Sequence, residues 1–229
     1  IIGRSDAQIL EQFAADPSKL SVEEMVYGAN KLVKDDATRQ KWNEAIAKQY
    51  PSDYRALNNM AQQAISKGDV AAAQNYLKQA ANVNKNASEV NTNLALMALK
   101  SGDVAKAETY LSKGTGSDTF KEVMGNLNIA KGNYTQAASD LAGVNTNSAA
   151  LAQILAKDYT SAKTTLSKIK NADATTSYLQ AVLAARTGDA SALSSSLKNA
   201  IQQDGTLAAR AAKDLEFAKY ANVVKNLVK

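Results

Sequence analysis

The chain has 229 residues, of which 45% are hydrophobic and 21% are charged, and its formal net charge is +5 at pH 7. This composition supplies enough apolar material for a folded core and excludes disorder driven by charge. The chain contains no His and no Cys, which excludes disulfides, Ser-His-Asp and Cys-His nucleophiles and nearly every transition-metal site. We therefore expect a protein that is not an enzyme and that uses no cofactor or metal.

The charged residues are dispersed along the chain. Residues 1–114 hold 14 basic and 13 acidic side chains, residues 115–229 hold 13 and 9, and neither half has a run of like charge. This pattern predicts a solvated surface and no nucleic-acid partner. No apolar run approaches the roughly 20 residues that a membrane span needs, so we expect no span in this chain. The chain begins with Ile1, which indicates a processed protein or one part of a longer protein.

The first predicted element is a short leading helix over residues 5–15, within a leading segment of residues 1–20. Ser21 and Glu24 then have the Ser-x-x-Glu form of a capping box, in which each side chain accepts the exposed backbone N–H of the other residue. The box predicts a helix that runs as far as Asp35-Asp36.

A second helix is predicted over residues 37–50, with Trp42 on its apolar face, and it stops before Pro51. Together with the helix that precedes it, this element forms a degenerate repeat over residues 21–53.

Short polar breakers then separate the apolar helical runs at five places. They are Lys67-Gly68-Asp69, Ser101-Gly102-Asp103, Lys131-Gly132-Asn133, Ala156-Lys157-Asp158 and Thr187-Gly188-Asp189. Their middle residues are 34, 30, 25 and 31 residues apart. Glycine closes one helix and aspartate caps the next, and a recurring period in this range is typical of a solenoid of stacked helix pairs.

The clearest unit begins at Tyr54. Its first helix is predicted near residues 53–67, with Asp53 as the N-cap, and its second helix begins after Asp69. The pattern of the unit is Leu57-x-x-Met60-Ala61-x-x-Ala64, Gly68-Asp69, Ala73-x-x-x-Leu77-x-x-Ala80. This pattern resembles the tetratricopeptide repeat, with Leu57 in place of the family's Trp and Lys85 where its Pro usually stands.

The resemblance implies an all-α fold: a right-handed superhelical solenoid of antiparallel helix pairs. About five repeats are recognisable over residues 54–205, and residues 206–229 are expected to form one or two capping helices. We expect residues 1–229 to form a single solenoid domain. The shorter intervals predict helices of about 10 residues between residues 114 and 175, where the units either bend the superhelix or have drifted because nothing binds there.

The resemblance also implies a binding groove lined by the first helix of each pair. The candidate binding residues are Arg55, Asn58, Asn59, Gln62, Glu89, Thr92, Asn93, Leu96, Asn126 and Tyr178. The paired Lys and Asn with which the chaperone-binding members of the family grip a carboxylate are missing, because Asn58 and Gln62 stand in those positions. Asn59 and Asn93 recur at a position where the family often carries Asn for structural reasons.

The predicted function is a non-catalytic scaffold that binds a protein or peptide segment. Two alternatives remain open: a carbohydrate or cell-wall ligand module, for which Tyr178 is the one aromatic candidate, and an architectural spacer. Residues 50–59 and 214–220 resemble repeat segments of bacterial cell-envelope proteins, some of which carry an OmpA-like domain. This resemblance implies a location in the periplasm or at the outer membrane, with the cytoplasm as the alternative.

Overall fold

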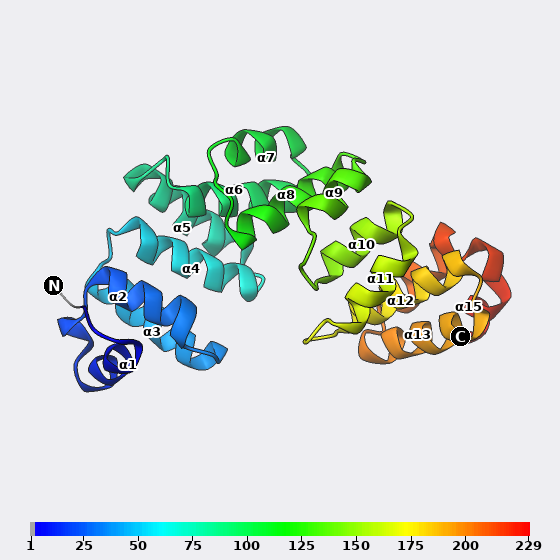
Figure 1. The fold of residues 1–229 in the computed structure, drawn as a ribbon, viewed down its shortest axis with the longest axis horizontal. Coiled ribbons are helices and arrows are strands. Elements are labelled where there is room, and N and C mark those ends of the chain that lie inside the picture. Colours follow the sequence, from blue (N-terminus) through cyan, green and yellow to red (C-terminus); the bar gives the residue numbers. More distant parts are fainter. Residues whose placement is uncertain (1–2) are drawn as a thin grey trace. The chain divides into compact units, whose positions relative to one another are not determined.

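The computed structural model of the chain describes residues 3–229, and every regular element in that range is a helix (Figure 1). The expected all-α class is confirmed. The helices form two compact units, of which unit 1 ends at Phe120 and unit 2 runs from Lys121 to Lys229. The single continuous domain stays a prediction, because a compact unit is not the same thing as an independently folding domain.

Unit 1 consists of helices that pack in consecutive pairs. They are α1 (Asp6–Ala15), α2 (Val22–Tyr27), α3 (Asp36–Gln49), α4 (Tyr54–Ser66), α5 (Val70–Val83), α6 (Ser88–Lys100) and α7 (Val104–Leu111), with a 3₁₀ turn η1 (Pro17–Lys19) and a π-helical turn η2 (Gly28–Leu32). Helix α4 packs on α5, α6 packs on α7, and α4 also contacts α6 in the next pair.

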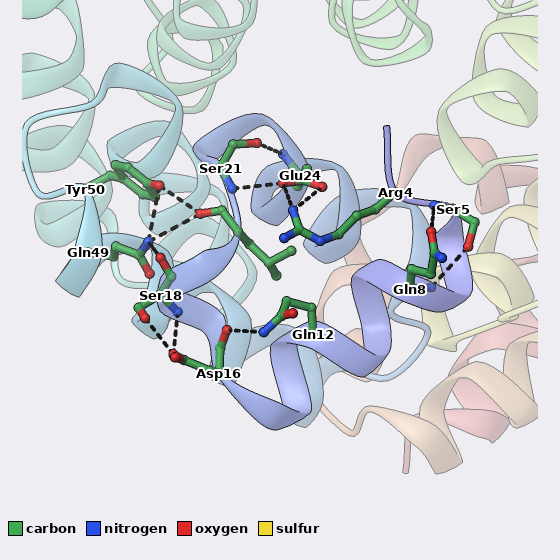
Figure 2. Close-up of polar contacts among 11 residues, drawn as sticks. Arg4, Ser5, Gln8, Gln12, Asp16, Ser18, Ser21, Glu24, Gln49 and Tyr50 are labelled. Atoms are coloured by element: carbon green, nitrogen blue, oxygen red, sulfur yellow. Dashed lines mark hydrogen bonds and ion pairs between the residues drawn. The ribbon is translucent and has the colours of Figure 1, made fainter. Parts of the chain in front are cut away.

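The first two α-helices begin with complete capping boxes. Ser5 pairs with Gln8 at the start of α1, and Ser21 pairs with Glu24 at the start of α2 (Figure 2). Arg4 ties the two helix starts together, since its guanidinium donates to both carboxylate oxygens of Glu24 at 2.9 and 3.1 Å. The predicted leading helix and the predicted capping box are both confirmed.

One predicted helix is too long. Helix α2 ends at Tyr27, and the chain continues through the wide turn η2 rather than as an α-helix to Asp35-Asp36. At this point the Gly28 backbone lies against the indole of Trp42, and a Cβ on Gly28 would lie 2.2 Å from Trp42 Cζ3. The Trp42 ring is 3% exposed and stacks on Phe13, with ring centroids 3.8 Å apart. The widened turn thus accompanies a close contact with a large aromatic ring.

Unit 2 contains the shortest helices of the repeat region. Its elements are α8 (Asp118–Ala130), which begins just before the unit boundary, α9 (Tyr134–Asp140), α10 (Asn147–Leu155), α11 (Tyr159–Ser167), α12 (Ala174–Thr187), α13 (Ala190–Gln203), α14 (Leu207–Lys213), the 3₁₀ turn η3 (Leu215–Tyr220) and α15 (Ala221–Leu227). Helices α10 and α11 have 9 residues each and α9 has 7, as the predicted shortening requires, whereas α8 keeps 13 residues and is not shortened. The predicted closing helices are also present.

The breakers act as local stop and start signals. Each predicted aspartate cap accepts a backbone N–H of its own helix at 2.8–3.2 Å; the caps are Asp53, Asp69, Asp103, Asp158 and Asp189. The breaker glycines close the preceding helices with φ between 75° and 81°; they are Gly68, Gly102, Gly132 and Gly188. Capping therefore accounts for these aspartates without any catalytic role.

Lys157 occupies a breaker position where the other units have glycine. Its φ is 65°, and within residues 3–229 it is the single non-glycine residue with positive φ. Because a Cβ is strained in the left-handed region, we expect Lys157→Gly to raise the free energy of unfolding by about 1 kcal/mol. Urea denaturation of both proteins measures this difference, with Gly102→Lys as the converse control. An unchanged midpoint for Lys157→Gly would contradict the strain.

Candidate functional site

The candidate surface in unit 1 is carried by α4 and α6, the first helices of neighbouring pairs. Arg55 and Gln62 on α4 occupy the same repeat positions as Glu89 and Leu96 on α6, and residues seven apart lie on one side of a helix. Gln62 and Glu89 are exposed, whereas Arg55 and Leu96 are half-buried. We call these four residues the A face.

Arg55 is bound within the protein. Its Nε and Nη2 donate to the two carboxylate oxygens of Asp53 at 3.0 and 2.9 Å, and its Nη1 donates to Glu23 at 3.1 Å. The Arg55 guanidinium holds the pKa of the Asp53 carboxyl below its usual range. Arg55 thus connects the cap of α4 to α2, so it supports the fold as well as contributing a positive charge to the A face.

Three candidate residues between the A-face positions are buried. Asn58, Thr92 and Asn93 are only 2–3% exposed, which disagrees with their expected place in the lining of a binding groove. Asn93 Nδ2 donates to Asn58 Oδ1 at 2.9 Å and thereby joins α6 to α4. Thr92 donates to the carbonyl oxygen of Ser88 at 2.8 Å. None of the three reaches a ligand while the helices stay packed.

Asn59 belongs to a second set of buried amides. Its Nδ2 donates to Asn43 Oδ1 at 3.2 Å, and its Oδ1 accepts from Asn30 Nδ2 at 3.4 Å. Asn43 also donates to Gln63 Oε1 at 3.3 Å. The set joins α3, α4 and η2, which agrees with the structural role that the resemblance offered for Asn59. The recurrence of Asn59 and Asn93 was the visible signal, whereas nothing in the sequence pattern marked Asn43.

The last two candidates lie in unit 2 and are described apart from the A face. Asn126 on α8 is half-buried. Tyr178 on α12 is 3% exposed, and its hydroxyl donates to Asp214 Oδ2 at 2.6 Å. The pKa of the Tyr178 hydroxyl is raised above its usual value, mainly by burial and to a smaller extent by the bond to Asp214. The expected exposed aromatic at Tyr178 is thus corrected, because α12 packs this ring against the closing segment, with Phe217 at a centroid distance of 5.5 Å.

The part of the chain that the structure describes has neither a metal-binding cluster nor a membrane-spanning helix. Within residues 3–229, no three His, Cys, Asp or Glu side chains are grouped so that they would hold a metal ion. No helix in the same range is long and apolar enough to cross a membrane.

The repeated helix pairs share the same internal packing, which is typical of helical-repeat proteins. A small residue of the first helix and a leucine of the second are both buried in each unit; the small residues are Ala61, Ala95, Gly125, Ala150 and Ala181, and the leucines are Leu77, Leu111, Leu141, Leu166 and Leu197. A Cβ on Gly125 would lie 2.5 Å from Leu141 Cγ, so the two helices of that pair meet at this point. The chain is a helical-repeat protein.

Comparison with known proteins finds one repeat family that part of the chain resembles. The tetratricopeptide repeat model matches residues 64–123, and no curated protein sequence matches the chain. Over these residues the chain is similar to the tetratricopeptide repeat, as the pattern of its sequence indicated. Proteins with this fold serve in general as non-catalytic scaffolds for protein interaction.

Three solved structures share the fold at low identity. The crystal structure of the APC/C hetero-tetramer Cut9-Hcn1 matches with a TM-score of 0.65 and 12% identity over 96% of this chain and 45% of that chain. A tetratricopeptide repeat protein from Parabacteroides merdae ATCC 43184 matches with a TM-score of 0.53 and 13% identity, over 97% of this chain and 89% of that chain. PilW, a widely conserved type IV pilus biogenesis factor, matches with a TM-score of 0.54 and 15% identity, over 94% of this chain and 96% of that chain. The chain thus spans less than half of the Cut9-Hcn1 chain.

Proposed function

We propose that the chain is a non-catalytic scaffold that binds a protein or peptide segment on the A face, with no cofactor and no nucleic acid. The observation that carries this proposal is the contrast between locked and free positions on α4 and α6. The buried hydrogen bond from Asn93 Nδ2 to Asn58 Oδ1, which is 2.9 Å long, holds the two helices together. Gln62 and Glu89 remain exposed beside it, with Leu96 half-buried. A preformed surface of this kind lowers the entropy lost on binding.

The chemistry of the A face favours a particular kind of segment. Leu96 offers an apolar contact, and Gln62 offers an amide that both donates and accepts hydrogen bonds. Glu89 offers a carboxylate near the Tyr54 hydroxyl. Burial is the main cause that raises the pKa of this hydroxyl, and the charge of Glu89 is a smaller one. A peptide with one apolar side chain and a basic residue beside it matches these groups. The Cut9-Hcn1 structure, a hetero-tetramer by its description, supports the general use of the fold in assembly.

A peptide selection tests the A face. Peptides of random sequence are displayed on phage, selected on the full chain, and then measured for binding as synthetic peptides. We expect micromolar dissociation constants, and Glu89→Lys or Leu96→Ser weakens binding at least about tenfold, because each variant removes a central contact. The control is Lys78→Glu, a charge reversal on an exposed residue of α5. Selected peptides that bind both A-face variants unchanged would overturn the assignment.

Arg55 is a poor choice for the same experiment. A charge reversal there breaks its bonds to Asp53 and Glu23, so a loss of binding would not separate contact with the ligand from damage to the fold.

We also propose a location in the bacterial cell envelope, in the periplasm or at the outer membrane. The support is the fold shared with the pilus biogenesis factor PilW, together with the two envelope-like segments, residues 50–59 and 214–220. Fractionation of the native cells followed by immunoblotting tests the location. Recovery in the cytoplasmic fraction would favour the cytoplasmic alternative.

A further inference from the structure

Each unit contains a cleft between the second helix of one pair and both helices of the next. The cleft in unit 1 lies between α5, α6 and α7 and has a volume of about 260 Å³. The cleft in unit 2 lies between α11, α12 and α13 and has a volume of about 630 Å³. Counted from Gly102 and Gly188, the lining residues of the second pair stand at the same repeat positions in both clefts. We call the larger one the unit 2 cleft.

The unit 2 cleft is more open because smaller or more polar side chains line it. At two equivalent positions a long or aromatic side chain of unit 1 is replaced by a small one in unit 2, and at a third position a leucine is replaced by a polar glutamine. The pairs are Leu94 and Gln180, Lys106 and Ala192, and Tyr110 and Ser196. The chain therefore provides both a filled and an open version of one site.

The walls of the unit 2 cleft are rich in hydroxyl groups. The hydroxyl residues that line it are Tyr159, Thr160, Thr164, Ser167, Thr187 and Ser196. Helix α11 has the sequence YTSAKTTLS and α13 begins ASALSSS, whereas α5 has no Ser or Thr and α7 has only Thr109. Ser and Thr cost helix stability, at roughly 0.5 kcal/mol each, so their concentration on these two helices opposes local propensity. Departures of this kind are expected at functional surfaces.

Three of these hydroxyl groups already donate hydrogen bonds within their own helices. Thr164 donates to the Thr160 carbonyl oxygen at 3.2 Å, and Ser167 donates to the Thr164 carbonyl oxygen at 2.7 Å. Thr187 likewise donates to the Leu183 carbonyl oxygen at 2.9 Å. Since the protons of these three hydroxyl groups are already used, their oxygen lone pairs are what remains for a ligand. A ligand that bonds to these three oxygens must supply hydrogen-bond donors.

The remaining lining is neutral overall and apolar at its base. The buried floor consists of Leu166, Leu183 and Ala184, which are 4%, 8% and 5% exposed. The rim carries one cation, Lys163, and one anion, Asp189. This balance gives no preference for a charged ligand.

We propose that the unit 2 cleft binds a short neutral oligosaccharide. Sugar hydroxyls supply the donors that the acceptor-rich walls need, and the C–H face of a pyranose ring fits the apolar floor. The Gln180 amide, which makes no hydrogen bond within residues 3–229, both donates to and accepts from hydroxyl groups. The volume of about 630 Å³ lies within the range of small-molecule sites. The proposal does not rest on peptide binding by the A face.

The test is an NMR titration of the full ¹⁵N-labelled chain with maltotetraose, cellotetraose and tetra-N-acetylchitotetraose, each up to about 10 mM. We expect at least one of them to shift amide signals of residues that line the unit 2 cleft. The filling variant Ala192→Lys/Ser196→Tyr carries the side chains that unit 1 has at the same positions, so it is compatible with the fold. It should weaken binding at least about tenfold, because the added side chains occupy the site.

The matched control is Lys106→Ala/Tyr110→Ser, which opens the unit 1 cleft without giving it hydroxyl-rich walls; we expect it to gain no sugar binding there. No shifts with all three sugars would overturn the proposal, and so would equal binding by the filling variant. Neither result would affect the A face, whose residues lie on α4 and α6 of unit 1.

Discussion

Replacing Arg186 with Met is expected to lower the free energy of unfolding by about 2–3 kcal/mol, because it removes one partner of a shielded ion pair. Arg186 Nε and Nη2 donate to the two oxygens of Glu216 at 2.7 Å each, and Nη1 donates to the Ile154 carbonyl oxygen at 3.0 Å. One side chain of α12 therefore holds the end of α10 and the closing turn η3. Met keeps the aliphatic packing and leaves Glu216 without its cation. Because the two side chains are 22% and 28% exposed, we place the loss below that of a fully buried pair.

Chemical denaturation measures the effect, and two further variants isolate its cause. Arg4→Met breaks the more exposed pair with Glu24 and should cost less than about 1 kcal/mol. The double variant Arg186→Met/Glu216→Leu removes both charges and should recover about half of the loss or more. If Arg186→Met is no less stable than Arg4→Met, the ion pair does not hold the closing segment.

Replacing Gly28 with Ala is expected to lower the free energy of unfolding by about 2 kcal/mol. The steric clash of the new Cβ costs more than the higher helix propensity of Ala returns. The added Cβ would lie 2.2 Å from Trp42 Cζ3 and 2.7 Å from its Cη2. The indole has no easy escape, since it is 3% exposed and stacked on Phe13 at 3.8 Å. Near-ultraviolet circular dichroism of the single Trp reports the ring displacement directly, and thermal denaturation reports the loss of stability.

Gly116→Ala is the matched control, because a Cβ there meets no atom within 4 Å and the φ of Gly116 is not positive. A second variant, Gly28→Ala/Trp42→Leu, replaces the ring by the residue type that the regular units place opposite a buried Ala. We expect it to be more stable than Gly28→Ala alone. Equal stability of Gly28→Ala and the unchanged chain would show that the Trp42 ring moves freely.

The sequence predicts helix ends in this chain well because caps are local. Asp69, for example, accepts the backbone N–H of Ala72 three residues later, and Gly68 closes the preceding helix with φ of 75°. Both signals lie within one breaker and need no knowledge of distant packing. The exception is the end of α2, where the shape of the turn depends on Trp42 in the next helix.

The sequence predicts the candidate binding surface less well because helical periodicity does not distinguish a solvated polar residue from one bonded to a neighbouring pair. Asn58 is a candidate for the groove by its position in the repeat, yet its side chain bonds to Asn93, 35 residues further along the chain. Tyr178 is likewise the aromatic candidate of the groove, but its hydroxyl bonds to Asp214, 36 residues away. Gln62 and Glu89, which lack such buried partners, are the candidates that remain exposed.

The ties between successive pairs also have a mechanical consequence. The bonds of Arg186 to Ile154 and to Glu216 span 32 and 30 residues, and the bond from Asn93 to Asn58 spans 35, so each covers about one repeat. A pulling force on the two ends would therefore release the helix pairs in succession, each rupture freeing a similar length of chain. The same short sequence separations allow rapid refolding once the force is removed, because each loop that must close is small.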